Sequence, residues 1–187
     1  WMEVLKRDYN HPCIVTWVPV NERWGVPTLA QDERQREHLR ALYALTKSFD
    51  STRPVVDNDG WEHVRTDIVT IHDYSSKGET LLERYGSDAA LTHLVTTGRP
   101  LHYPPLLEEH LIANDAPVML TEFGGISYKP DPDTKWFGYG TVTSAQEYVD
   151  RLADLVGAAL DCPGISGFCY TQLTDTEQET NGLLNAQ

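Results

Sequence analysis

Two glutamates in this chain follow directly on segments that predict β-strands. Glu22 comes just beyond an apolar run at residues 14–20, and Glu122 directly follows a second run at residues 117–121. Residues that end separate parallel strands converge on one face of a barrel. Two carboxyl groups about 5–5.5 Å apart can hydrolyse a glycoside with retention, because one attacks the anomeric carbon while the other protonates the leaving oxygen. The pair predicts that chemistry, whereas either glutamate alone would more often cap a helix or pair with a basic residue.

Predicted strands and helices, which must position these glutamates, alternate along the chain. Short apolar runs predict strands at residues 14–20, 54–57, 67–72, 117–121 and 167–172. Helical patterns lie between them, most clearly at residues 31–49 and 144–160, the latter opening with a capping box. We expect an α/β fold made of roughly five βα units of a (β/α)₈ barrel. Residues 86–105 and 124–140 predict long loops, and residues 1–8 predict the end of a helix without signal-peptide features.

The length, charge and cysteine content of the chain favour some classes of protein over others. The chain has 187 residues, 40% of them apolar and 23% charged, and these values are ordinary for a single globular domain. With 15 basic and 28 acidic residues its formal charge is −13, which disfavours nucleic acid and membrane surfaces and suits a neutral substrate. Cys13, Cys162 and Cys169 are odd in number and lack metal-ligand spacing, so we expect reduced core thiols and a cytoplasmic location.

Three segments resemble one enzyme family. Residues 10–22, Asn-His-Pro-Cys-Ile-Val-Thr-Trp-Val-Pro-Val-Asn-Glu, resemble the acid/base signature of glycoside hydrolase family 2, which includes β-galactosidases, β-glucuronidases and β-mannosidases. Residues 121–125 are similar to the family's nucleophile segment, and residues 167–175 resemble the last strand of its TIM barrel. The resemblance implies that residues 1–187 carry strands 4 to 8, with strands 1 to 3 and the N-terminal sandwich domains outside the chain.

The resemblance also assigns roles to individual residues. It makes Glu22 the general acid/base and Glu122 the nucleophile. Asn21 would donate a hydrogen bond to the sugar 2-hydroxyl, and Tyr74 would donate one to the nucleophile. From the residues alone, Asn21 could instead cap the following turn, and Tyr74 could be a wall aromatic with an exposed hydroxyl.

Three further aromatic residues are candidates for sugar contacts. Trp61 and Trp136 could stack on pyranose faces, although a lone tryptophan is as often core or rim packing. Tyr170 stands where many family members have tryptophan, at the floor of the glycone pocket. The acidic run at residues 174–183 resembles a bacterial subgroup of the family, but a solvated turn is the simpler interpretation.

No metal or cofactor is predicted. His72 and Asp73 lack further ligands and read as a satisfied pair at a strand end. A divalent or sodium ion, which some members of the family use, would depend on ligands absent from this chain.

The predicted function is hydrolysis of terminal β-glycosides, of the β-galactoside type, through a covalent glycosyl-enzyme. Two alternatives stay open: another retaining barrel glycosidase such as a cellulase or mannanase, or a non-catalytic carbohydrate-binding fragment. The expected partner is a carbohydrate, with no nucleic acid and no membrane. Because five parallel strands leave two unpaired edges, we also expect an oligomer or completion by the missing N-terminal part, and no activity from the isolated piece.

Overall fold

A computed structural model describes residues 1–98, 101, 105–108, 115–129, 133 and 138–184. Contacts divide the chain into two compact units, one made of residues 1–71 and 92–119, the other of residues 72–91 and 120–187. The elements follow in the order α1 (Met2–Asp8), α2 (Glu33–Phe49), β1 (Val69–Asp73), α3 (Gly78–Tyr85), α4 (Asp88–Thr97), β2 (Val118–Gly124), β3 (Ile126–Tyr128), β4 (Gly140–Val142), α5 (Ala145–Leu160) and β5 (Ile165–Thr171).

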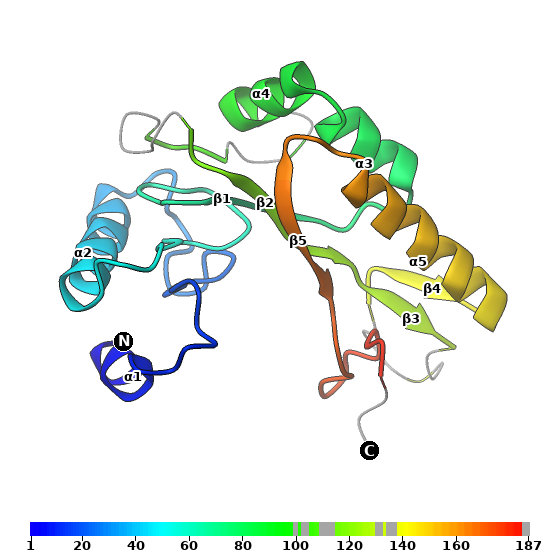
Figure 1. Cartoon of the computed structure of the whole chain (residues 1–187), viewed down its shortest axis with the longest axis horizontal. Helices are drawn as coiled ribbons and strands as arrows, with labels where there is room; N and C mark the ends of the chain where they lie inside the picture. The colour runs from blue at the N-terminus through cyan, green and yellow to red at the C-terminus, as the bar shows by residue number, and fades with distance from the viewer. Residues whose placement is uncertain (99–100, 102–104, 109–114, 130–132, 134–137, 185–187) are drawn as a thin grey trace. The chain divides into compact units, whose positions relative to one another are not determined.

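A three-stranded sheet has the order β1-β2-β5, which confirms three of the five predicted strands (Figure 1). All five residues of β1 are buried, as its β-branched sequence favours. Helices α3 and α4 connect β1 to β2, and α5 connects β2 to β5; parallel strands need such helical crossover connections.

The predicted loop at residues 86–105 is wrong in part, because α4 occupies residues 88–97. Its two glycines, Gly86 and Gly98, and its prolines all lie outside residues 88–97, so no helix breaker interrupts α4.

The first unit contains the other two predicted strands, at residues 14–20 and 54–57, and there the prediction is wrong. The structure has only isolated parallel bridges, which pair Trp17 with Val55 and Asn21 with Asp59. Proline explains the break, because Pro19 and Pro54 have no N–H to donate to a continuous ladder. Single hydrogen bonds remain, such as the one from the Trp17 N–H to the Pro54 carbonyl oxygen at 3.0 Å.

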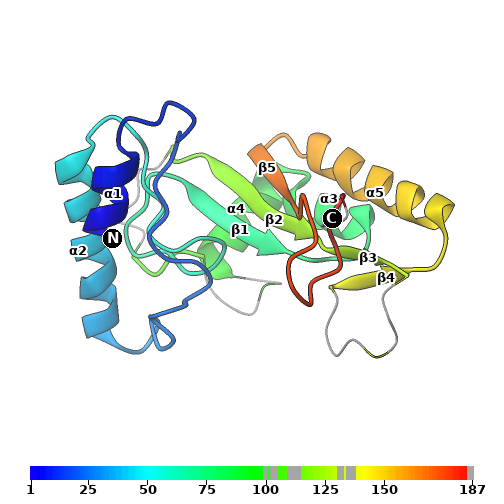
Figure 2. The ribbon, with the colours of Figure 1, turned by 90° about the horizontal axis from the view of Figure 1, so that it is seen from below.

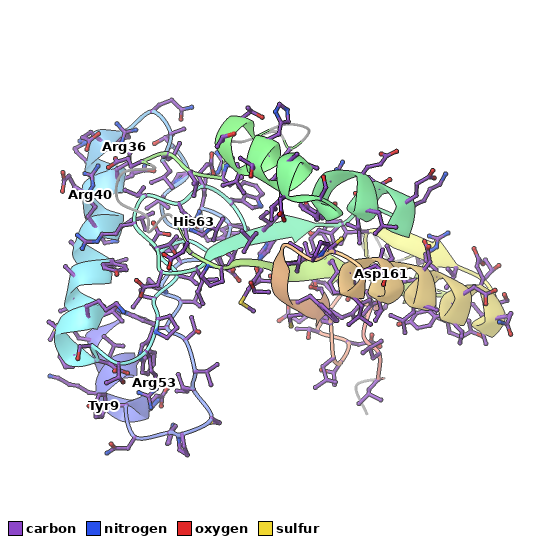
Figure 3. The ribbon with its side chains drawn as sticks, turned by 45° about the horizontal axis from the view of Figure 1, so that its top comes forward. Tyr9, Arg36, Arg40, Arg53, His63 and Asp161 are labelled. Carbon is purple, nitrogen blue, oxygen red and sulfur yellow. The ribbon has the colours of Figure 1, made fainter. Side chains whose placement is uncertain are left out.

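Helix α2 packs its apolar face into the first unit. The Asp32 side chain accepts from the Arg34 N–H, so the helix begins at residue 33 rather than 31. Leu39 and Tyr43 are buried, whereas Arg40 pairs at the surface with Glu33 and Glu37, two residues of the same helix; Figure 3 labels this arginine on α2. Among the described residues of this unit, two clusters of buried side chains pack together, one of Leu5, Trp17, Tyr43 and Val55 and one of Val26, Leu29, Leu39 and Val64.

In the second unit α3 and α5 lie side by side (Figures 1 and 2), and the Asp154 carboxylate accepts from the Gly78 N–H at 2.7 Å. The capping box of α5 is altered. Ser144 accepts from the Glu147 N–H at 3.2 Å, but the Glu147 carboxylate accepts from the Thr143 N–H at 3.0 Å instead of returning to Ser144. The stretch predicted as a loop at residues 124–140 contains β3, which pairs in parallel with β4.

The three cysteines are free thiols, as expected. Only Cys162 is buried, so the prediction of core thiols is wrong for Cys13 and Cys169, whose side chains are exposed. Among the described residues, no helix has the length and apolar character needed to cross a membrane.

Candidate active site

Glu22 lies in a tight turn that follows the bridge between Asn21 and Asp59. Its N–H donates to the Asp59 carbonyl oxygen at 3.1 Å, and its side chain is half-buried. Glu22 and Arg23 have φ angles of 48° and 63°, in the left-handed region that residues other than glycine rarely adopt. Two consecutive residues in that region must be held there by their surroundings.

Asn58 supplies part of that support. This side chain is fully buried, and its Oδ1 accepts from the Arg23 N–H at 2.9 Å. Its Nδ2 donates to the Glu62 carbonyl oxygen, also at 2.9 Å. One amide therefore links the turn that carries Glu22 to the loop at residues 58–62.

Beneath that loop lies a buried pair of Asp57 and His63. Asp57 Oδ1 is 2.7 Å from His63 Nδ1, and its Oδ2 accepts from the N–H groups of Val64 at 2.7 Å and Arg65 at 2.9 Å. Neither side chain of the pair is exposed. Figure 3 shows His63 among the loops of this unit. Asp57 thus anchors both ends of the segment that holds Asn58.

Trp61 carries a cation on its ring. The Arg23 guanidinium lies 4.5 Å from the ring centroid, and Arg23 Nε is 2.9 Å from Glu62 Oε2. Glu62 is almost wholly buried, and that burial raises the pKa of its carboxyl group. Arg23 thus covers one face of the Trp61 ring, and the stacking of a sugar on Trp61 stays a prediction.

In the second unit, Glu122 lies in β2, and two side chains lie close to one of its carboxylate oxygens. The Tyr74 hydroxyl donates to Glu122 Oε2, which is the contact that the sequence predicted. His72 Nδ1 lies 3.5 Å from the same oxygen. Burial, followed by the hydrogen bond to Glu122, raises the pKa of Tyr74 well above its usual range, so the phenol stays protonated and able to donate. The role of Glu122 as nucleophile stays a prediction.

His72 and Asp73 serve different neighbours, as consecutive residues of a strand do. His72 is directed at Glu122, whereas Asp73 accepts from the Tyr85 hydroxyl at 2.7 Å and pairs with Arg84 of α3. His72 was not among the site residues predicted from the sequence. Its spacing of two residues from Tyr74 was the available signal, because residues two apart share one face of a strand.

Tyr139 is a second aromatic residue that the sequence analysis missed. Its ring stacks on that of Tyr74, with the centroids 3.4 Å apart and the planes 10° from parallel. It immediately precedes β4, in the stretch predicted only as a loop. No local pattern marks such a residue, because the contact joins positions 65 residues apart (139 − 74).

Tyr170 of β5 packs against the strand that carries Glu122. A Cβ atom on Gly124 would lie 2.2 Å from its ring, and its hydroxyl accepts from the Ile126 N–H at 3.3 Å. Burial raises the pKa of this phenol above its usual range. Tyr170 thus supports the end of β2; its predicted place in a pocket floor stays a prediction.

The acidic run after β5 forms a turn, as the simpler interpretation held. Asp175 Oδ1 accepts from the Gly182 N–H at 2.9 Å, and Glu179 pairs with Thr176 in an antiparallel bridge. Asn181 Oδ1 accepts from Gln172 Nε2 at 2.7 Å, which ties the turn to the end of β5.

The structure thus brings together two groups of candidates, each within its own unit. The first unit holds Asn21 and Glu22 as chain neighbours and reaches Trp61 through Arg23. The second gathers Tyr74 and Glu122. Trp136 lies outside the described residues.

A sheet whose strands end in acidic and aromatic side chains, with helices as connections, is typical of (β/α)₈ barrel enzymes. The chain belongs to glycosyl hydrolase family 2: the model of that family's TIM barrel domain matches residues 1–123. Its fold is accordingly part of a (β/α)₈ barrel.

Solved structures of the same fold agree. A family 2 β-galacturonidase from Eisenbergiella tayi, bound to galacturonate, matches 98% of this chain with a TM-score of 0.64 and 20% identity. A β-glucuronidase from Bifidobacterium dentium matches 97% with a TM-score of 0.58 and 25% identity. The chain spans 32% of the first of these proteins and 29% of the second. No curated protein matched the sequence.

Proposed function

We propose that this chain carries both carboxyl groups of a retaining β-glycosidase, with Glu122 as nucleophile and Glu22 as general acid/base. The observation that carries the proposal is the setting of Glu122, where a protonated phenol and a buried imidazole meet one carboxylate oxygen. A carboxylate held on one oxygen presents its other oxygen in a defined direction, which suits attack on an anomeric carbon.

In this mechanism Glu122 attacks the anomeric carbon while protonated Glu22 donates its proton to the leaving oxygen. Glu22 then takes a proton from the water that releases the sugar from the ester. Asn21, the neighbour of Glu22, would donate to the sugar 2-hydroxyl, a contact that strengthens in the oxocarbenium-like transition state. These proton transfers need no cofactor.

For the substrate we propose a neutral glycone of the β-galactoside type. The formal charge of −13 disfavours an anionic sugar. Arg23, the cation beside Glu22, is already paired with Glu62. A β-uronide is the second candidate, because structural relatives are described as a β-galacturonidase and β-glucuronidases. In either case the rest of the barrel would come from another part of the protein or from a second copy.

The test uses the full-length protein and aryl β-glycosides. We expect hydrolysis of the β-galactoside with product of retained configuration, and a preference for the β-glucuronide or β-galacturonide would favour the second candidate. Glu122→Gly should abolish turnover, and azide should restore it as a glycosyl azide of inverted configuration. Glu83→Gln, an exposed glutamate of α3, is the matched control and should leave turnover unchanged. A rescue product of retained configuration would assign the nucleophile to another residue, and failure to hydrolyse any β-glycoside would contradict the proposal.

A further inference from the structure

We propose that Tyr139 is a positioning residue that acts through Tyr74: its ring packs against the phenol and holds the hydroxyl on Glu122. This inference rests on the proposed role of Glu122 as nucleophile. The residues involved all lie in the second unit, on the ends of β1 and β2 and at the start of β4.

The rings of Tyr139 and Tyr74 are in direct contact. Tyr74 follows β1 directly, so its ring stands at a strand end, where the backbone alone leaves the side chain free to turn. Tyr139 covers one face of that ring, with a centroid separation of 3.4 Å and an interplanar angle of 10°. Movement of the Tyr74 ring toward the face that Tyr139 covers would collide with this neighbour. The stack therefore narrows the range of orientations open to the phenol, and the hydrogen bond to Glu122 lies within that range.

Backbone contacts fix the position of Tyr139. Its N–H donates to the Gly125 carbonyl oxygen at 2.9 Å, and the following residues pair in parallel with residues 126–128. Gly125 has φ of 60°, and a Cβ atom there would lie 2.6 Å from Tyr139 Cδ2 and 3.3 Å from the Tyr74 ring. Gly138 has φ of 149°, and a Cβ atom there would lie 2.6 Å from the Gly125 carbonyl oxygen. Two glycines thus allow the close approach that brings the rings together.

Positioning of Tyr74 and direct binding of substrate are two roles that differ in their kinetic consequences. About half of the Tyr139 side chain, 47%, is exposed, so contact with a sugar is the competing explanation. A residue that only binds substrate changes KM and acts independently of Tyr74. A positioning residue lowers the rate of attack by Glu122, and its effect disappears once the Tyr74 hydroxyl has been removed.

The experiment is a double-mutant cycle in the full-length enzyme with Tyr139→Ala, Tyr74→Phe and the double variant. The measured rate is that of covalent trapping of Glu122 by an activated 2-deoxy-2-fluoro glycoside, followed by mass spectrometry. We expect Tyr139→Ala to slow trapping about 10- to 100-fold, as misplaced reacting groups do. It should add little in the Tyr74→Phe background, and Tyr139→Phe should retain the wild-type rate because it keeps the ring.

Tyr128→Ala is the matched control, since Tyr128 is similarly exposed at 45% and lies outside this stack. It should leave the trapping rate unchanged. Tyr139→Leu gives a second test should the alanine variant unfold. Equal, additive losses in both backgrounds, or a change in KM alone, would overturn the inference.

A crystal structure of the Tyr139→Ala enzyme provides a readout that does not depend on activity. We expect the Tyr74 hydroxyl to leave Glu122 or to occupy several positions. A Tyr74 phenol in its wild-type position in the Tyr139→Ala structure would overturn the inference, whatever the activity of the variant. Absence of hydrolysis by the wild type would contradict the proposed function and leave this structural outcome to decide on Tyr139 separately.

Discussion

His63 accepts from the Thr70 N–H at Nε2, at 2.9 Å, and this contact decides how its ring meets Asp57. Because Nε2 must offer its lone pair to that N–H, the hydrogen atom of the ring sits on Nδ1 and is donated to Asp57 Oδ1 at 2.7 Å. Asp57 thereby accepts hydrogen bonds from the His63 ring and from two backbone N–H groups at a fully buried position. The loop that supports the Glu22 turn is built on this fully buried pair.

Removal of the Asp57 carboxylate should therefore be costly. We expect Asp57→Ala to lower the free energy of unfolding by about 3–5 kcal/mol, as loss of one partner from a buried pair does. Urea denaturation of the full-length protein, followed by near-ultraviolet circular dichroism, measures this change. Asp161→Ala, at an exposed position after α5, should change it by less than about 0.5 kcal/mol. Similar losses for both aspartates would contradict the framework role of Asp57.

Asn58 connects that framework to the acid/base residue. We expect Asn58→Ala to release the Arg23 N–H and let the left-handed turn relax, so that Glu22 protonates the leaving group less well. The rate loss should be larger for glycosides with basic leaving groups than for a dinitrophenyl glycoside, which departs without a proton. Measuring kcat/KM over a series of leaving groups checks this. Equal losses across the series would point to general misfolding.

Tyr74→Phe removes the hydroxyl from Glu122 and keeps the ring. A hydrogen bond to a charged group is worth about 1.5–3 kcal/mol, so we expect kcat/KM to fall about 10- to 150-fold. The Tyr85→Phe variant is the control, since its hydroxyl donates to Asp73 on the other side of β1 and should affect stability rather than rate. An unchanged rate for Tyr74→Phe would exclude a role for this hydroxyl in attack.

The lowered pKa of Asp50 predicts that the first unit loses stability at low pH. Burial by itself raises the pKa of this carboxyl group, but hydrogen bonds from Thr52, Trp17 and Arg53 outweigh it and hold the pKa well below the usual 3.8. The carboxylate therefore contributes stability above the unfolded-state pKa, and this contribution is lost as the pH falls below 3.8 toward the folded-state value.

We accordingly expect Asp50→Asn to lower Tm at pH 7, with the difference from wild type shrinking progressively below pH 3.8. Calorimetry across that pH range measures it. Asp161→Asn, at an exposed aspartate, should show no such pH-dependent difference. A Tm difference that stays constant down to pH 2 would contradict the assignment.

Much of this molecule was already determined by its sequence. Strands β1, β2 and β5 were readable because short apolar runs alternate with segments of helical periodicity. The N-cap of α5, Ser144, was readable because an N-cap is a local hydrogen bond. The family followed from residues 10–22, and with it the contact of Tyr74 with Glu122 that the structure contains.

Only the tertiary structure shows which segments and side chains hold the candidate site residues in place. The segments at 14–20 and 54–57 form bridges instead of strands, because prolines interrupt a ladder whose partner the local sequence does not specify. The stack of Tyr139 on Tyr74 joins residues far apart in the chain, and it exists because glycines at positions 125 and 138 let two backbones meet. The residue types at strand ends indicate which side chains can react. The orientation of those side chains depends on long-range packing, which no local sequence pattern encodes.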